Sequence, residues 1–274
     1  MEKNSYPTIK DAIFLCLFLG AIQFGMILIP FILVFLYGVG LESQNYMRGQ
    51  LFLSILSFAI VIYWGYKKSY KKFDGILKFN GVSLHIWLSI IIFMSGFVLL
   101  VQRIDSISSY LIPSLQSMSQ ELTLYCVNEH LFVSLLLIGI ILPFTQEILF
   151  RGIILNGFKE NYSQKKSIII SAVLFGITTL SFPGFVFGII SAWICLKTKS
   201  IIPSIFIDML YNSASVFMLK FSNMAPVSEF IAAYNEHPFK LSWYDAIGLV
   251  LTVAGIFLLL NSIRKHKAIS NDSI

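Results

Sequence analysis

Charged residues are scarce in this sequence. Only 12% of its 274 residues are Asp, Glu, Lys or Arg, whereas 57% are hydrophobic. A soluble domain carries about 25% charged residues, so this composition excludes a disordered chain, a nucleic-acid-binding domain and an ordinary soluble enzyme. The long apolar runs instead predict a protein that crosses the lipid bilayer several times and has no nucleic-acid partner.

Cysteine and histidine are also rare, with three and four residues. The cysteines show no CxxC or Cys/His spacing, which excludes a disulfide framework. The histidines all lie in predicted loops or at the ends of predicted spans, and they are His85, His130, His237 and His266. We therefore expect no metal site with the usual histidine ligands and no cofactor.

The apolar runs predict an all-α fold, a polytopic membrane helix bundle of about eight transmembrane helices. They cover residues 12–41, 51–66, 86–101, 131–158, 167–180, 184–196, 201–219 and 246–263. The fifth and sixth runs are shorter than the roughly 20 residues that cross a bilayer, and a Ser-Phe-Pro-Gly turn joins them. This pattern favours a hairpin of short helices that is covered by other helices.

These runs divide one integral-membrane domain into three parts. Residues 1–130 hold about three N-terminal transmembrane helices and a polar connection. Residues 131–220 form the core, and residues 221–274 contain an outer loop, the last transmembrane helix and a basic tail.

The positive charges predict the topology. If the N-terminus is cytoplasmic, 16 of the 20 Lys and Arg residues fall on the inner side, and the exceptions are Arg48, Arg103, Lys220 and Lys240. Cytoplasmic loops carry an excess of Lys and Arg. We therefore expect a multi-pass protein with both termini in the cytoplasm.

Three ionisable residues interrupt the apolar runs. Glu147 and Arg151 are spaced i,i+4 in the fourth run, in the order that favours an ion pair. Asp208 lies in the seventh run, one helical turn before Asn212. Charges inside a membrane are costly and usually pair in the bundle interior. They predict a polar cluster, which is either a site for hydrolysis, transport or proton relay, or a structural network that fixes helix packing.

Three segments resemble motifs of one family. Residues 146–152, Gln-Glu-Ile-Leu-Phe-Arg-Gly, are similar to the Glu-Glu-x-x-x-Arg motif of the CPBP family, the CAAX prenyl protease and Abi (bacteriocin-processing) intramembrane proteases. Residues 171–176 resemble the start of the second motif, Phe-x-x-x-His. Residues 196–205 resemble the run that leads into the third, His-x-x-x-Asn. The similarity covers about residues 130–220 and keeps the family's order and spacing.

The resemblance also identifies three departures at candidate catalytic positions. In active family members the first Glu activates the attacking water, but here that position is Gln146. The two motif histidines are replaced by Thr179 and Asp208. An amide cannot act as a general base, and an ionised carboxylate would repel an oxyanion. The retained family positions are Glu147, Arg151, Phe175 and Asn212.

These departures lead us to expect a catalytically degenerate family member, a pseudoenzyme that acts as a membrane scaffold or partner-binding protein. Its partners would be the lipid bilayer and another membrane protein, a peptide or a transmembrane helix. One alternative is an active endopeptidase, of the CAAX type or for bacteriocin processing or immunity, that uses a variant site around Glu147 with Asp208. A second is a small transporter or lipid-binding protein. The resemblance implies a bacterial plasma membrane.

Overall fold

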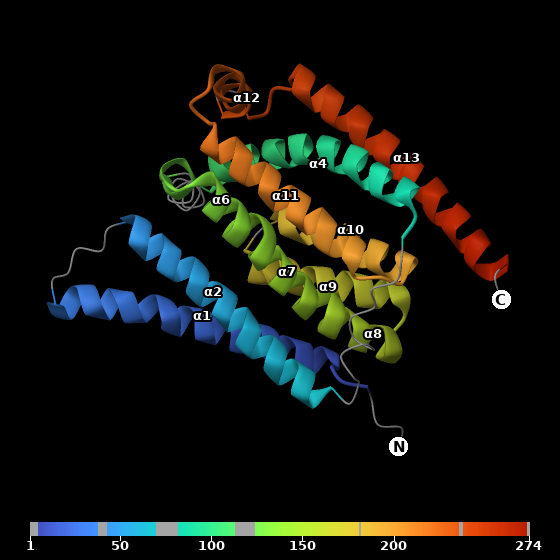
Figure 1. Ribbon diagram of the computed structural model, residues 1–274, viewed down its shortest axis with the longest axis horizontal. Helices are drawn as coiled ribbons and strands as arrows, with labels where there is room; N and C mark the ends of the chain where they lie inside the picture. The colour runs from blue at the N-terminus through green and yellow to red at the C-terminus, as the bar shows by residue number, and fades with distance from the viewer. Residues whose placement is uncertain are drawn as a thin grey trace. The chain divides into compact units, whose positions relative to one another are not determined.

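The computed structural model describes residues 5–37, 43–69, 82–112, 124–180, 182–235 and 238–272. Within these ranges the regular structure is helical throughout, and the ribbon in Figure 1 contains no strand among them. Part of the predicted polar connection, residues 113–123, and His237 lie outside the described residues.

The described helices fit the eight apolar runs. Six helical segments are long and apolar enough to cross a membrane: Ile9–Met26, Tyr46–Lys68, Leu84–Leu111, Leu131–Asn161, Ile202–Lys220 and Trp243–Lys265. The fifth and sixth runs are the helices α9 (Gln164–Thr178) and α10 (Phe182–Thr198), which have 15 and 17 residues. The all-α, polytopic membrane bundle is therefore confirmed, and α9 and α10 are the short members that the sequence predicts.

The chain forms two compact units that alternate along the sequence. Unit 1 comprises Met1–Phe79 and Leu136–Asp208, and unit 2 comprises Asn80–Leu135 and Met209–Ile274. The helix α11 (Ile202–Lys220) begins in unit 1 and ends in unit 2.

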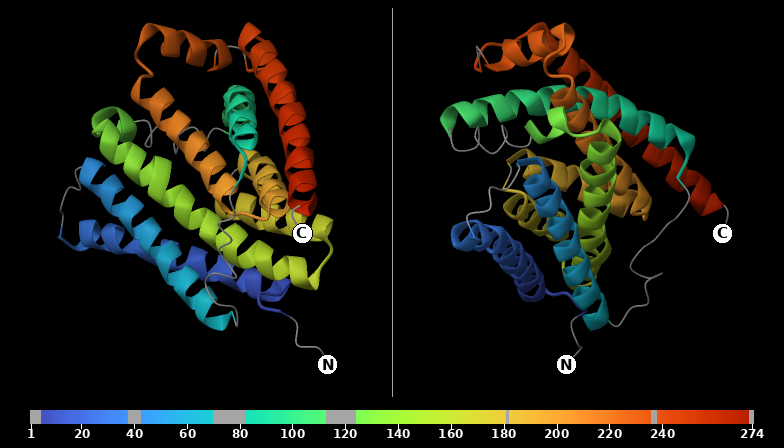
Figure 2. Two further views of the ribbon diagram at one scale, coloured as in Figure 1. Left: turned by 45° about the vertical axis from the view of Figure 1, so that its right-hand side comes forward. Right: turned by 60° about the vertical axis from the view of Figure 1, so that its left-hand side comes forward.

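Unit 1 contains α1, α2, the fourth apolar run, and the hairpin of α9 and α10. Helices α1 (Ile9–Tyr37) and α2 (Ser43–Lys68) run side by side in opposite directions (Figures 1 and 2). The hairpin packs tightly because its contact residues are small: a Cβ added at Gly188 would lie 3.0 Å from the Cα of Ala172. Small residues of this kind let membrane helices approach closely.

The N-terminal segment of unit 1 is fastened to the end of α8 (Asn156–Asn161). The Asn161 side chain donates to the Ser5 carbonyl and accepts from the Ser5 amide at 3.0 Å. Pro7 packs so closely on Gly157 that a Cβ there would overlap the proline ring. These contacts hold the beginning of α1 beside the end of α8.

Unit 2 is built around α4 (Leu84–Leu111) and α13 (Trp243–Asp272), with α12 (Ala225–Asn235) and the short α6 (Leu131–Ser134). Glycines bring α4 and α13 together. A Cβ at Gly96 would lie 2.5 Å from the Gly248 carbonyl oxygen, and one at Gly255 would overlap the backbone of Phe93. The two helices therefore meet backbone to backbone along one face.

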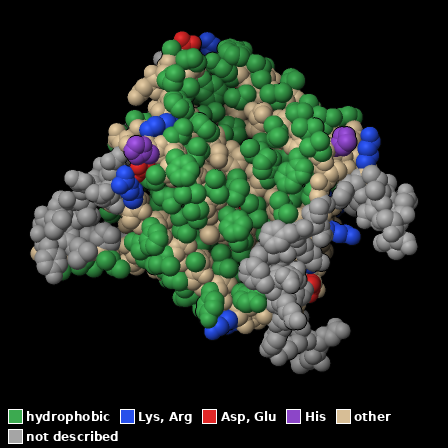
Figure 3. Space-filling view, viewed as in Figure 1, with side chains coloured by type: hydrophobic (Ala, Val, Ile, Leu, Met, Phe, Trp, Pro, Cys, Tyr) green, Lys and Arg blue, Asp and Glu red, His purple; other side chains and the backbone are tan. Residues whose placement is uncertain are grey.

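The outer surface of the helices is apolar. Figure 3 shows hydrophobic side chains spread over much of the described part of the visible face. Many are large and well exposed, such as Phe35 on α1 and Val250 on α13. In a membrane protein such side chains contact lipid, because the bilayer core is as apolar as they are.

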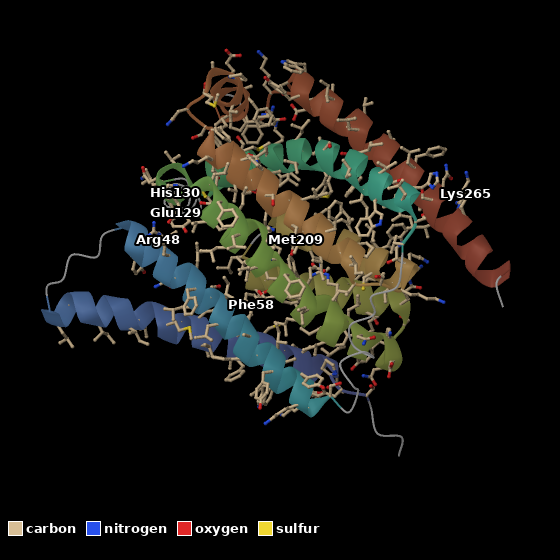
Figure 4. All side chains as sticks on the ribbon, viewed as in Figure 1. Arg48, Phe58, Glu129, His130, Met209 and Lys265 are labelled. Atoms are coloured by element: carbon tan, nitrogen blue, oxygen red, sulfur yellow. The ribbon has the colours of Figure 1, made fainter. Side chains whose placement is uncertain are left out.

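Two of the histidines, His85 and His130, lie at helix starts. His85 is exposed in the first turn of α4, and His130 precedes α6, next to Glu129 (Figure 4). The buried Glu129 carboxylate accepts a hydrogen bond from the His130 amide at 2.9 Å. Their positions at span ends agree with the sequence analysis.

Candidate functional site

The candidate site is built on a helical stretch with an irregular backbone. Two π-helical segments, η1 (Leu135–Ile141) and η2 (Ile148–Leu155), flank the six-residue α7 (Leu142–Glu147). Pro143 stands at the start of α7 and has no amide to donate to the preceding turn, and its ring crowds the carbonyl four residues earlier in a regular helix. A widened turn before it relieves that crowding. π-helical turns are rare and frequently occur at functional sites.

Glu147 lies at the junction of α7 and η2 and is completely buried. Its Oε1 is 2.9 Å from Nη1 of Arg151, one turn later, and its Oε2 accepts a hydrogen bond from the Ser191 hydroxyl at 3.1 Å. The i,i+4 pair that the sequence predicts therefore forms. Each carboxylate oxygen has a partner within the protein, and neither faces solvent.

Arg151 is held from two further directions. Its guanidinium carbon lies 4.5 Å from the centroid of the Phe175 ring on α9, and its Nη2 donates to the Gly188 carbonyl of α10 at 3.4 Å. Phe175 in turn meets Phe150 edge to face at 5.0 Å between ring centroids. The retained aromatic residue thus provides the surface on which the buried arginine rests.

A chain of serines extends the cluster toward α11. Ser191 on α10 donates to Glu147, and the Ser204 hydroxyl on α11 donates to the Ser191 carbonyl at 3.0 Å. Both serines are fully buried. Sequence reasoning missed them, because isolated serines are common in membrane helices and their partners lie 44 and 13 positions away in the chain.

The three substituted positions have different surroundings. Gln146 is half-buried beside Glu147 in the chain. Thr179 is half-buried at the end of α9, where its hydroxyl donates to the Phe175 carbonyl at 2.9 Å. Asp208 is buried on α11, with 2% of its surface exposed. The hydrogen-bond donor of Thr179 is thus already used within the last turn of its own helix.

The retained Asn212 lies one turn after Asp208 on α11 and is half-buried. It belongs to unit 2, whereas the other five candidate residues belong to unit 1. Direct contacts join Glu147 and Arg151 to each other within unit 1.

This arrangement favours charge neutralisation over proton transfer. A general base must reach the proton that it removes. Glu147 is fully buried, with Oε2 hydrogen-bonded to Ser191 and Oε1 in the ion pair with Arg151. In the part of the chain that the structure describes, no three His, Cys, Asp or Glu residues are grouped so that they could hold a metal ion.

Comparison with known proteins identifies one family. Residues 128–214 match the family model described as type II CAAX prenyl endopeptidase Rce1-like. This segment contains all six candidate residues from Gln146 to Asn212, and the match confirms the resemblance to the CPBP family over this part of the chain. Neither the curated proteins nor the solved structures give a match.

Proposed function

We propose that this membrane protein, whose residues 128–214 are Rce1-like, is a catalytically degenerate relative of the CAAX prenyl endopeptidases. In this proposal the protein binds another membrane protein, a peptide or a transmembrane helix, and does not cleave it. The observation that carries the proposal is the complete burial of Glu147 between Arg151 and Ser191.

The energetics of that pair support a structural role. Removing one partner of a buried ion pair costs about 3–5 kcal/mol, so withdrawing Glu147 from Arg151 to activate water would cost a similar amount. The serine and the Phe175 ring add further contacts that such a movement would break. Glu147 therefore serves best as the partner of Arg151, which fixes α7 and η2 against α9 and α10.

The substituted residues support the same conclusion. Gln146 stands where family members carry the water-activating Glu, and an amide nitrogen or oxygen does not accept a proton at neutral pH. Thr179 already donates to the backbone of its own helix. A carboxylate at Asp208 would repel the negative charge that develops during peptide hydrolysis. Binding is then the function that the helix bundle can still perform without these groups.

The test compares protein termini in membranes of host cells that lack this protein. The cells are complemented with the wild type, with Glu147→Gln, or with Glu160→Gln, which changes an exposed glutamate on the same helical stretch. We expect the same termini in all three samples at matched expression. Termini that appear with the wild type and Glu160→Gln but vanish with Glu147→Gln would show an active endopeptidase and overturn the proposal.

Crosslinking in the same membranes tests the binding half of the proposal. We expect a specific membrane protein or peptide to be captured by the wild type and equally by Glu147→Gln, provided that this variant is folded. Capture of lipid alone by the wild type would contradict partner binding and favour a lipid-binding or transport role.

The location that we propose is a bacterial plasma membrane with both termini in the cytoplasm. An even number of crossings puts both termini on one side, and this holds for the six long helices as well as for the eight apolar runs. Reporter fusions at each terminus test the proposal: both should show cytoplasmic activity, and a periplasmic signal from either would contradict it.

A further inference from the structure

Unit 1 carries exposed lysines on three helices near the N-terminal segment that is hydrogen-bonded to α8. Lys10 lies in the first turn of α1, Lys68 is the last residue of α2, and Lys166 lies in the first turn of α9. We call these three residues the lysine rim. They come from distant parts of the sequence, and their grouping depends on the fold.

Aromatic contacts place Lys68 beside the beginning of α1. The Phe14 ring, one turn after Lys10, lies 5.2 Å from the Trp64 ring between centroids. The Lys68 ammonium lies 3.8 Å from the Trp64 centroid and 5.9 Å from that of Phe14. Because α1 and α2 run in opposite directions, Lys10 and Lys68 are at the same end of the pair (Figures 1 and 2).

A second set of contacts brings the beginning of α9 to the same place. The Tyr162 hydroxyl accepts a hydrogen bond from the Ile9 amide at 3.2 Å. The Lys166 ammonium lies 4.9 Å from the centroid of the Tyr162 ring. Lys166 is therefore linked through one tyrosine to the residue that precedes Lys10.

The aromatic rings indicate the depth of the rim in a membrane. Trp and Tyr concentrate at the boundary between hydrocarbon and headgroups, and lysine stems lie along apolar surface while the ammonium group stays in the polar layer. Lys68 on Trp64 and Lys166 on Tyr162 both have this form. In a membrane this form would put their charges at the level of lipid phosphates.

Few described acids oppose this charge. The half-buried Asp11 is turned to the helix start, where it accepts from the Thr8 amide at 2.9 Å and the Thr8 hydroxyl at 2.7 Å. Glu160 is exposed near the rim. Further exposed lysines lie at the same ends of α2 and α9 and on α8, and they are Lys67, Lys165 and Lys159. The excess charge is positive.

We propose that the lysine rim is a binding site for the phosphate groups of anionic phospholipids. Basic clusters at a membrane surface attract such lipids, and three ammonium groups at headgroup depth match the charge and the position of their phosphates. The contacts to aromatic rings restrict two of the lysines before a lipid arrives. This proposal is independent of the proposed function, because it involves none of the residues near Glu147.

The test measures lipid retention by the full-length protein in native mass spectrometry at low ionic strength. Phosphatidylglycerol and phosphatidylcholine with identical acyl chains are offered in equal amounts. We expect the wild type to prefer phosphatidylglycerol. In the triple variant Lys10→Gln, Lys68→Gln and Lys166→Gln, phosphatidylglycerol binding should weaken about fivefold for each lysine removed, whereas phosphatidylcholine binding should stay the same.

Two matched variants control for charge and folding. Lys240→Gln, Arg264→Gln and Lys265→Gln remove the same charge from exposed sites of unit 2 and should keep the preference (Lys265 is labelled in Figure 4). Lys→Arg at all three rim positions should also keep it. Equal binding of both lipids by the wild type, an equal loss in the unit 2 control, or a loss in the arginine variant would overturn the proposal. Capture of an acidic protein without any lipid preference would overturn it as well.

Discussion

The two units each contain a buried arginine–carboxylate pair, and the pairs differ in what they connect. In unit 1, Arg151 pairs with Glu147 one turn away in the same helical stretch. In unit 2, Arg103 on α4 pairs with Asp245 on α13, 142 positions away in the chain. Each arginine also lies over an aromatic ring, Phe175 at 4.5 Å and Tyr234 at 4.1 Å.

The unit 2 pair joins two helices through many atoms. Nε and Nη2 of Arg103 reach the two oxygens of Asp245 at 3.2 and 2.8 Å, and Nη1 donates to the Pro238 carbonyl at 3.1 Å. Asp245 also accepts from the Ser242 amide at 2.6 Å, which caps the start of α13. This pair joins the start of α13 to α4 near the surface, where the Arg103 and Asp245 side chains keep 9% and 8% exposure.

The difference shows that a buried ion pair is not by itself a sign of chemistry. The Arg103 guanidinium makes more hydrogen bonds than that of Arg151. The Arg103–Asp245 pair nevertheless lies far from the family motifs in the sequence, and it joins α4 to α13. The Glu147–Arg151 pair lies inside the matched segment and also consists of an arginine, a carboxylate and an aromatic ring under the guanidinium. We propose the same structural role, fixing helix packing, for both pairs.

The largest expected effect comes from breaking the fully buried pair. Arg151→Met should lower the free energy of unfolding by about 3–5 kcal/mol, because it leaves the carboxylate of Glu147 buried without a cation. Chemical denaturation in mixed micelles, followed by circular dichroism, measures this. Arg151→Met combined with Glu147→Leu should recover much of the loss. A double variant as unstable as the single one would contradict the structural role.

Breaking the unit 2 pair should cost less. Asp245→Asn keeps the shape of the side chain but removes the charge that Arg103 contacts, and hydrogen bonds to charged groups contribute about 1.5–3 kcal/mol each. We expect a loss of about 2–3 kcal/mol in the same denaturation assay, since nearby solvent relieves the remaining charge. A larger loss than for Arg151→Met would reverse the ranking of the two pairs.

Helix contacts extend the comparison between units. Gly255→Ala on α13 should destabilise by about 1–3 kcal/mol, because the new methyl group overlaps the Phe93 backbone. Gly188→Ala on α10 should cost less, since its nearest neighbour is 3.0 Å away. Gly20→Ala on α1 is the control: nothing lies within 4 Å of its added Cβ, so it should be neutral or stabilising. Equal losses at Gly255 and Gly20 would show that the close α4–α13 contact is wrong.

The smallest expected effect is the difference in stability loss between Arg103→Lys and Arg151→Lys, which depends on how each guanidinium contacts its carboxylate. Arg103→Lys removes a two-point contact with Asp245, whereas Arg151→Lys keeps one nitrogen near Glu147. Lysine cannot reproduce the planar fork of arginine. Arg103→Lys should therefore cost about 1 kcal/mol more than Arg151→Lys in paired thermal unfolding scans. The opposite order would mean that the unit 2 contact is weaker than its geometry suggests.

Local patterns in the sequence predicted much of this structure. The apolar runs gave the helices because their length and composition leave few alternatives in a membrane, and the i,i+4 spacing predicted the Glu147–Arg151 pair. Long-range contacts were not predicted. In the sequence Arg103 indicates only topology and Asp245 carries no signal, because charges at span ends are ordinary. Ser191 and Ser204 were missed for a similar reason, since their partners depend on how the helices pack.

The central claim is that Glu147 is a structural partner of Arg151 and that catalysis has been lost at several positions. Its most direct test is Gln146→Glu, which returns the acid to the motif position, with protein termini in the membrane measured by mass spectrometry. The account predicts a folded variant with no new termini, because Glu147 stays paired and neither Thr179 nor Asp208 supplies an imidazole. Cleavage products that appear with this single change, and not with the wild type, would contradict it.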